Sequence, residues 1–233
     1  MARSSDPTRV LLAVAVAWAG GACGPSHRLG EYDFRGATLS TVAEVPTTPD
    51  ILTGPHFVGT PSNAVEALLD LGSRAARELS VRSIQDKLER ATERVNVGAI
   101  LEDEAQRRAS RYLRAETSPT VEDSDFLLEM YVYEYGIEAS DWDASAYFFI
   151  DAEATLLDQN GAVEVWRAGV KARDPVGPEI FGEGVVRDVV TATAILDLSE
   201  EDMVRALERL AGFAATEITG QLREDLLDVQ RRD

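Results

Sequence analysis

The sequence predicts an α+β domain in which an antiparallel sheet of about four strands packs against helices and a long helix ends the chain. In three central segments, 126–133, 146–156 and 162–172, every second side chain is apolar with the exception of Glu164, which is the period of a strand with one buried face. On both sides of them, apolar residues recur every three or four positions, as in α-helices. Residues 33–233 are enough for one sizeable core, so we expect a single domain.

The first strand is expected at residues 36–45, because β-branched side chains are frequent there and Pro46 ends the segment. The stretch 46–61, which is rich in proline, glycine and threonine, is expected to be an irregular loop. The loop therefore separates this strand from the helices that follow.

Three helical segments are predicted after the loop. Ser62 or Asn63 can cap the first, and Glu66 follows Asn63 at the spacing of a capping box. The other two are expected at 84–95 and 98–114, where apolar side chains again repeat at helical spacing. These helices are expected to cover one face of the sheet.

The second and third central strands are predicted to form a hairpin whose turn length follows from their faces. Both carry apolar side chains at even positions, so even residues must pair with even residues, which excludes turns of two or four residues. A three-residue turn, 159–161, fits, and it ends with a glycine that can adopt the left-handed conformation. This register pairs Ala154 with Trp166 and Glu153 with Arg167.

The C-terminal part of the chain is predicted to be helical. Residues 185–196 combine near-helical spacing with β-branched side chains, so we expect a helix there, with a strand as the alternative. Ser199 can cap the last helix, and three acidic residues follow it at the end where the helix dipole favours negative charge. An apolar stripe from Met203 to Leu226 then predicts a long helix with one buried face.

The N-terminus has the plan of a secretory signal that leads to Cys23, the one cysteine of the chain. Arg3 and Arg9 precede an apolar run, 10–19, that is too short to span a bilayer, and small residues follow it. Small residues directly before a single cysteine resemble the lipobox of bacterial lipoproteins. In those proteins the cysteine becomes the acylated N-terminus of the mature chain.

The lipobox-like pattern divides the chain into three parts. We expect a signal peptide at 1–22, a lipidated tether at 23–32 and the folded domain at 33–233. A cut after Ala19 is the alternative, and it would release a soluble periplasmic protein with a free Cys23. Both interpretations place the domain in the cell envelope.

The formal net charge of −18 excludes some partners. An acidic surface repels nucleic-acid phosphates and anionic lipid headgroups, so we expect neither nucleic-acid binding nor attachment to a membrane by charge. Attachment is expected through the lipid on Cys23, with the domain facing the periplasm. Gly24, in place of an aspartate after the cysteine, favours the outer over the inner membrane.

No catalytic residue, metal site or cofactor is predicted. His27 and His56 lie in segments expected to be tether or loop, and neither has a nucleophile or a second ligand at a suitable spacing. The acidic clusters 122–125 and 141–143 lack the glycine and distal glutamate of a calcium loop. The segment 182–184, Gly-Glu-Gly, lacks the rest of a dinucleotide-binding fingerprint. We therefore expect that the protein is not an enzyme.

Five aromatic side chains at odd positions of two central strands are predicted to lie on the sheet face opposite the helices. They are Tyr131, Tyr133, Tyr135, Tyr147 and Phe149. Aromatic residues are enriched at protein interfaces, so this face is the candidate surface for a partner or an apolar ligand. The alternative is that a helix or the loop 46–61 covers them within the monomer.

The whole pattern resembles the small α+β envelope lipoproteins of Gram-negative bacteria. It comprises the lipobox-like signal, a polar tether, a strand, helices, three antiparallel strands of which the last contains Glu164-Val165-Trp166, and a long C-terminal helix. That group includes auxiliary lipoproteins of envelope ABC transporters and accessory lipoproteins of curli secretion and peptidoglycan synthesis. The resemblance implies a non-enzymatic adaptor or accessory subunit of an envelope transport or assembly complex, with a protein partner in the envelope. A periplasmic carrier of a lipid or other apolar ligand is the alternative.

Overall fold

The computed structural model describes residues 27–53, 81–139, 146–175, 195 and 197–231. Several predicted features lie outside these residues. They are the signal peptide, Cys23, His56, the helix from Ser62 to about residue 80, the cluster 141–143, the segment 182–184 and most of the segment 185–196.

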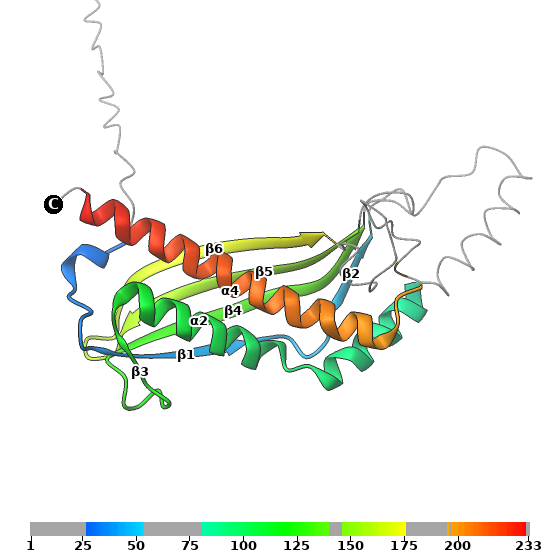
Figure 1. Cartoon of the computed structure of the whole chain (residues 1–233), viewed down its shortest axis with the longest axis horizontal. Coiled ribbons are helices and arrows are strands. Elements are labelled where there is room, and N and C mark those ends of the chain that lie inside the picture. Colours follow the sequence, from blue (N-terminus) through cyan, green and yellow to red (C-terminus); the bar gives the residue numbers. More distant parts are fainter. Residues whose placement is uncertain (1–26, 54–80, 140–145, 176–194, 196, 232–233) are drawn as a thin grey trace, which may run out of the picture.

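The described residues form two layers, as the α+β prediction requires (Figure 1). A sheet forms one layer, and two helices cross one of its faces side by side. They are α2 (Val97–Leu113) and α4 (Glu200–Gln230), which pack on each other as well as on the sheet. We call the sheet face under these helices the inner face and the opposite one the outer face.

The sheet has six strands, more than the four predicted. They are β1 (Thr38–Glu44), β2 (Asp50–Thr53), β3 (Glu116–Thr117), β4 (Phe126–Ala139), β5 (Ala146–Asp158) and β6 (Val163–Pro175). Their order is β3-β1-β4-β5-β6, and β2 pairs with the second half of β4. The three central strands are antiparallel, as predicted. The prediction of a fully antiparallel sheet is wrong for β1, β2 and β3, which are parallel to their neighbours, and β2 lies in the stretch predicted to be a loop.

The parallel pairing of β1 with β4 depends on the helices between them. Parallel neighbours need a long crossover connection, and the chain from β1 to β4 contains the helical residues 81–94 and α2. Helix α2 also satisfies backbone groups of β1. Glu102 accepts a hydrogen bond from the Ala43 N–H at 2.8 Å, and Gln106 donates to the Leu39 carbonyl at 3.1 Å. Beyond the residues that pair with β3, the Glu102 side chain therefore closes the β1 edge at Ala43.

The β5–β6 hairpin has the predicted faces but a different turn. Asp158 pairs with Val163, so the turn has the four residues 159–162, and its left-handed residue is Ala162, with φ of 49°, in place of the predicted glycine. The register shifts by one residue beyond Leu156, which pairs with Trp166. This β-bulge restores even-to-even pairing after a four-residue turn, so the predicted pairing of Ala154 with Trp166 is wrong.

Capping residues mark the described helix ends, and the cap of α4 is the predicted one. Asn96 caps α2 by accepting a hydrogen bond from the Ala99 N–H at 3.0 Å, and α2 ends at Arg114, a residue in the left-handed conformation. Ser199 caps α4 in a reciprocal capping box with Asp202, as the prediction of a long C-terminal helix requires. The predicted helix 84–95 coincides with the described helical residues 81–94.

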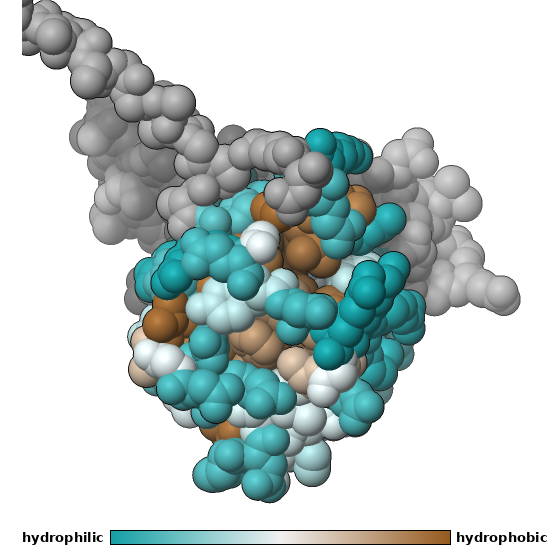
Figure 2. Space-filling model, turned by 90° about the vertical axis from the view of Figure 1, so that its left-hand side faces the viewer, coloured by the Kyte–Doolittle hydropathy of each residue, from teal (hydrophilic) through white to brown (hydrophobic). Residues whose placement is uncertain are grey.

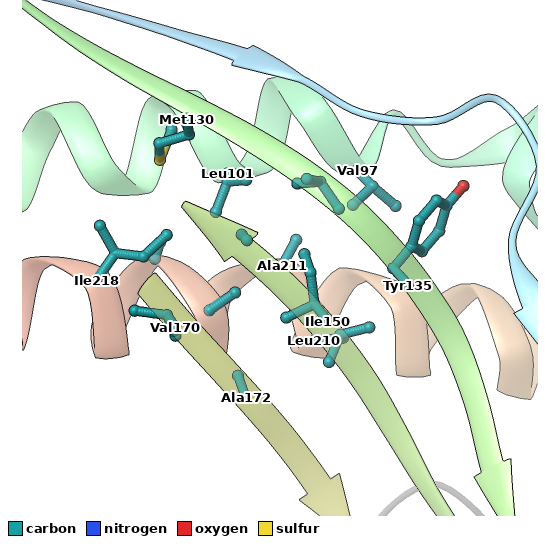
Figure 3. Close-up of a cluster of buried hydrophobic side chains, with 14 of the residues drawn as sticks. Val97, Leu101, Met130, Tyr135, Ile150, Val170, Ala172, Leu210, Ala211 and Ile218 are labelled. Atoms are coloured by element: carbon teal, nitrogen blue, oxygen red, sulfur yellow. The ribbon is translucent and has the colours of Figure 1, made fainter. Parts of the chain in front are cut away.

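The core lies between the inner face and the two helices (Figure 3). Helix α2 contributes Leu101, α4 contributes Leu210 and Ile218, and the strands contribute Met130 and Ile150, all of them buried. Full burial of one such side chain stabilises the fold by about 1.5–3 kcal/mol before the loss of conformational entropy is counted. Because α4 has small residues such as Ala211 and Ala214 on the same face, it can approach the sheet closely.

The segment before β1 belongs to the folded domain, although residues up to 32 were predicted to be tether. Leu29–Glu31 form a short 3-10 helix, η1, and Leu29 is fully buried. The Arg28 N–H donates to the Val165 carbonyl at 2.7 Å, which fixes the segment to β6. Phe34 is buried beside Phe126, with ring centroids 4.8 Å apart. The part of the predicted tether that precedes the domain is therefore only a few residues long.

Candidate functional site

The outer face of the sheet carries an exposed pair of tyrosines on β4. Tyr131 and Tyr133 keep 47% and 54% of their surfaces accessible. Their ring centroids are 5.0 Å apart and the rings are nearly perpendicular, which is a favourable geometry for two aromatic side chains. We call these two residues the tyrosine pair. An exposed aromatic pair on a rigid strand is typical of residues that bind another molecule.

A β-bulge in β4 separates the tyrosine pair from the other predicted aromatic residues. The register shifts between Val132 and Glu134, so Tyr133 is the additional residue. Beyond the bulge, odd-numbered residues of β4 face the helices, and Tyr135 is only 2% exposed. The prediction that Tyr135 lies on the outer face is therefore wrong, because it assumed an uninterrupted alternation.

The remaining two predicted aromatic residues lie on β5. Tyr147 is half-buried and Phe149, which pairs with Gly136, is buried. The five predicted residues thus do not form one exposed surface, and of the five only the tyrosine pair is exposed. A continuous aromatic groove, as the carrier alternative requires, is absent from the described outer face.

Cross-strand ion pairs surround the tyrosine pair. Arg167 on β6 donates to Glu153 on β5 at 2.9 Å and also to Glu164, and the hydrogen bond with Glu164 is the main reason why its pKa is raised. The predicted register pairing of Glu153 with Arg167 is wrong, because Arg167 lies opposite Thr155, but the two side chains still form an ion pair across the strands. Further along, Lys171 pairs with Asp151. Exposed ion pairs of this kind add little stability, so their main effect is to hold these charged side chains in fixed positions on the outer face.

A shallow hollow of about 370 Å³ opens beside the tyrosine pair. Its lining includes Tyr131, Glu129, Glu153 and Arg167 together with Val42. Small-molecule sites are mostly apolar, whereas this hollow is bordered by charged side chains. The arrangement suits a polar partner surface that places one apolar group against the tyrosine ring.

A second hollow, of about 510 Å³, lies on the opposite side of β4 and was not predicted. It is lined by the junction between the helical residues 81–94 and α2, by the end of β1 and by Tyr135. Burial and the nearby negative charge of Asp50 raise the pKa of Tyr135 to about 12. The phenol therefore stays neutral in the folded protein across the physiological pH range.

The raised pKa of Tyr135 predicts a loss of stability at high pH. An unfolded tyrosine ionises near pH 10, so between about pH 10 and 12 the unfolded state releases a proton that the folded state retains. This contribution is complete below pH 10 and is lost as the pH rises through about 12, and it amounts to about 2–3 kcal/mol. Urea unfolding at both pH values measures it. Tyr135→Phe should show a smaller decrease, and an equal decrease in both proteins would contradict the assignment.

Two of the other candidates from the sequence, the acidic cluster 122–125 and His27, lie in the described residues. In the acidic cluster 122–125, Asp125 accepts hydrogen bonds from the Thr38 N–H at 2.8 Å and from its hydroxyl at 2.9 Å, and these bonds lower its pKa. Asp125 therefore fixes the start of β1. Both ring nitrogens of His27 are buried and have no hydrogen-bond partner among the described residues.

Two further features are absent from the described part of the chain. Within it, no three histidine, cysteine or carboxylate side chains come together as metal ligands would. No helix there combines the length and the apolar composition needed to cross a bilayer.

No protein-family model and no curated protein sequence matches the chain. Solved structures with a similar outline include a protein of the family DUF330 from Xanthomonas campestris, at 16% identity and a TM-score of 0.36, covering 86% of this chain and 92% of that one. The PelC dodecamer subunit from Paraburkholderia phytofirmans has 10% identity, a TM-score of 0.31 and coverages of 76% and 88%. Lipoprotein GNA1162 from Neisseria meningitidis has 16% identity, a TM-score of 0.24 and coverages of 60% and 84%. At these scores the likeness carries no functional conclusion, which must come from the chain itself.

Proposed function

We propose that the protein is an envelope lipoprotein, anchored through Cys23 and facing the periplasm, that acts as a non-enzymatic adaptor. The observation that carries the anchor is the N-terminal pattern of two arginines, an apolar run too short to span a bilayer, and small residues before a single cysteine. The net charge of −18 makes attachment by charge unfavourable, so the lipid supplies the affinity for the membrane.

The outer face supports the adaptor part of the proposal. The tyrosine pair combines large apolar rings with hydroxyl groups, and both residues are held on a strand in the centre of the sheet. The ion pairs of β5 and β6 present both signs of charge beside it. A protein surface with one apolar residue and complementary charges would bind this face well.

The anchor is tested by labelling cells with a palmitate analogue. The wild-type protein should take up the label and sediment with membranes, whereas Cys23→Ala should lose both properties, because the cysteine thiol is the acylated group. A label that persists on Cys23→Ala would overturn the anchor. A wild-type protein that is unlabelled and soluble in the periplasm would favour the cut after Ala19.

The partner-binding face is tested by site-specific photo-crosslinking in cells. A photo-crosslinking amino acid at Tyr133 should give one adduct of defined mass, because this side chain is exposed at the centre of the proposed contact. The matched control is Glu208, which is exposed on the helical layer. The adduct should be absent in a Cys23→Ala background, where the domain is no longer held at the membrane. The same adduct from both positions, or none from Tyr133, would contradict the proposed face.

A further inference from the structure

One end of the domain brings together the start of the described chain and the ends of both long helices. It is formed by residues 28–37, 111–117 and 223–231, and we call it the tether pole. Gly30 lies directly against Val229 near the end of α4, and Arg223 lies over the ring of Tyr112, 5.6 Å from its centroid. Figure 1 shows that α4 runs from this pole along the length of the sheet.

The charges of the tether pole differ from those of the rest of the chain. Its three segments contain six arginines and six carboxylates, so the pole is neutral in a protein with a net charge of −18. Four of its arginines make no ion pair in the described part of the chain. They are Arg35, Arg111, Arg114 and Arg223. By contrast, the cations of the outer face at Arg167, Lys171 and Arg173 are all paired with carboxylates. The pole therefore keeps guanidinium groups available to an external anion.

Aromatic and apolar side chains lie between these arginines. A hollow of about 470 Å³ is lined by Tyr32, Tyr112, Arg35, Arg114 and Leu226, among others. The two tyrosines are only half-buried, and Leu227 in the last turns of α4 is exposed. Figure 2, which views this end directly, shows apolar side chains between hydrophilic ones. Tyrosine with arginine is the combination that suits the boundary between water and lipid.

The length of the tether limits the distance between the tether pole and the bilayer. Arg28 lies five positions after Cys23, so the two residues are at most about 18 Å apart when the chain is fully extended. Helix α4 alone has 31 residues, a length of about 46 Å. An acylated Cys23 therefore keeps the tether pole close to the bilayer, whereas the far end of α4 can stand clear of it.

We propose that the tether pole rests on the phospholipid headgroups of the membrane that holds the lipid anchor. The unpaired arginines donate hydrogen bonds to lipid phosphates, and Tyr32 and Tyr112 lie in the interfacial region. The domain thus stands on the bilayer, with α4 directed away from it, and the outer face with the tyrosine pair remains accessible from the side. This orientation rests on the proposed anchor at Cys23 and adds a second, non-covalent membrane contact.

The orientation is tested with the full-length lipidated protein in vesicles of phosphatidylethanolamine and phosphatidylglycerol. Because the single native cysteine is acylated, one introduced cysteine can carry a fluorophore without a competing thiol. Gln230→Cys places it at the tether pole, and the matched control Glu201→Cys places it near the other end of the same helix, about 43 Å away. Headgroup-labelled nitroxide lipids should quench the fluorophore at position 230 strongly and the one at 201 hardly at all.

A second comparison tests the arginines. Arg35→Gln combined with Arg114→Gln should remove most of the quenching at position 230, because two phosphate contacts are lost. Lys171→Gln combined with Arg173→Gln, on the outer face, should leave it unchanged. Equal quenching at both label positions, or none at either, on protein that floats with the vesicles would overturn the orientation. Unchanged quenching in the arginine variant would overturn the phosphate contact. Failure to float at all would overturn the proposed anchor, and with it this inference.

Discussion

Replacing Gly136 by alanine should destabilise the protein by about 3–4 kcal/mol and detach β2 from the sheet. Gly136 has φ of 153°, a conformation that other residues rarely adopt. A Cβ atom there would lie 1.9 Å from the Asp50 carbonyl oxygen, and the Asp50 backbone cannot move away while it pairs with β4. The change therefore strains β4 and removes the close approach of β2. Chemical denaturation should show a much lower midpoint than for the wild-type protein.

Gly169 provides the control for this prediction. It lies on β6, its backbone conformation is not left-handed, and an added Cβ would meet no atom within 4 Å. Gly169→Ala should change the free energy of unfolding by less than about 1 kcal/mol. Similar losses from both substitutions would show that the approach of β2 to β4 is not as close as described.

The alternation of apolar residues was sufficient to predict the three central strands. It also predicted which face of each strand is buried, as far as the first β-bulge. It could not predict the two β-bulges, at Tyr133 in β4 and near Val165 in β6, because a bulge adds one residue without changing the composition. Beyond each bulge, the odd and even positions of the strand exchange the sheet faces that they occupy. For this reason Tyr135 faces the helices, and the β5–β6 turn has four residues instead of three.

The parallel strands could not be predicted because strand direction depends on contacts between distant segments. Residues 38–44 pair with a segment almost ninety positions later, and no local pattern encodes that choice. The helices that lie in the described residues were predicted well, since their apolar spacing and the Ser199 cap of α4 are local signals.

The same limit applies to the candidate surfaces, because the sequence indicates a surface only when its residues are close together along the chain. The tyrosine pair was found because its two members are close in the sequence and on one strand. The tether pole was not predicted, because residues 28–37, 111–117 and 223–231 meet only in the folded chain. One signal for it is present in the sequence: these three segments contain as many arginines as carboxylates, whereas the chain as a whole is strongly acidic.

Replacing Trp166 by alanine should destabilise the protein by about 4 kcal/mol, the largest single-residue loss that we expect in the hairpin. Trp166 is almost completely buried between β6 and α4, and its Nε1–H donates to Asp225 at 2.8 Å. Trp166→Phe keeps most of the packing but loses the donor, so it should cost only about 1–2 kcal/mol. Urea unfolding of both variants separates the contribution of packing from that of the hydrogen bond.

The hydrogen bond between Trp166 and Asp225 also links the hairpin to the tether pole, because Asp225 belongs to the last turns of α4. Asp225→Asn keeps an acceptor and should be nearly neutral, whereas Asp225→Ala should resemble Trp166→Phe. Combining Trp166→Phe with Asp225→Ala should cost less than the sum of the two, since each removes the same bond. Fully additive losses would mean that the two residues are not coupled. In that case the end of α4 would be held against β6 by packing and not by this hydrogen bond.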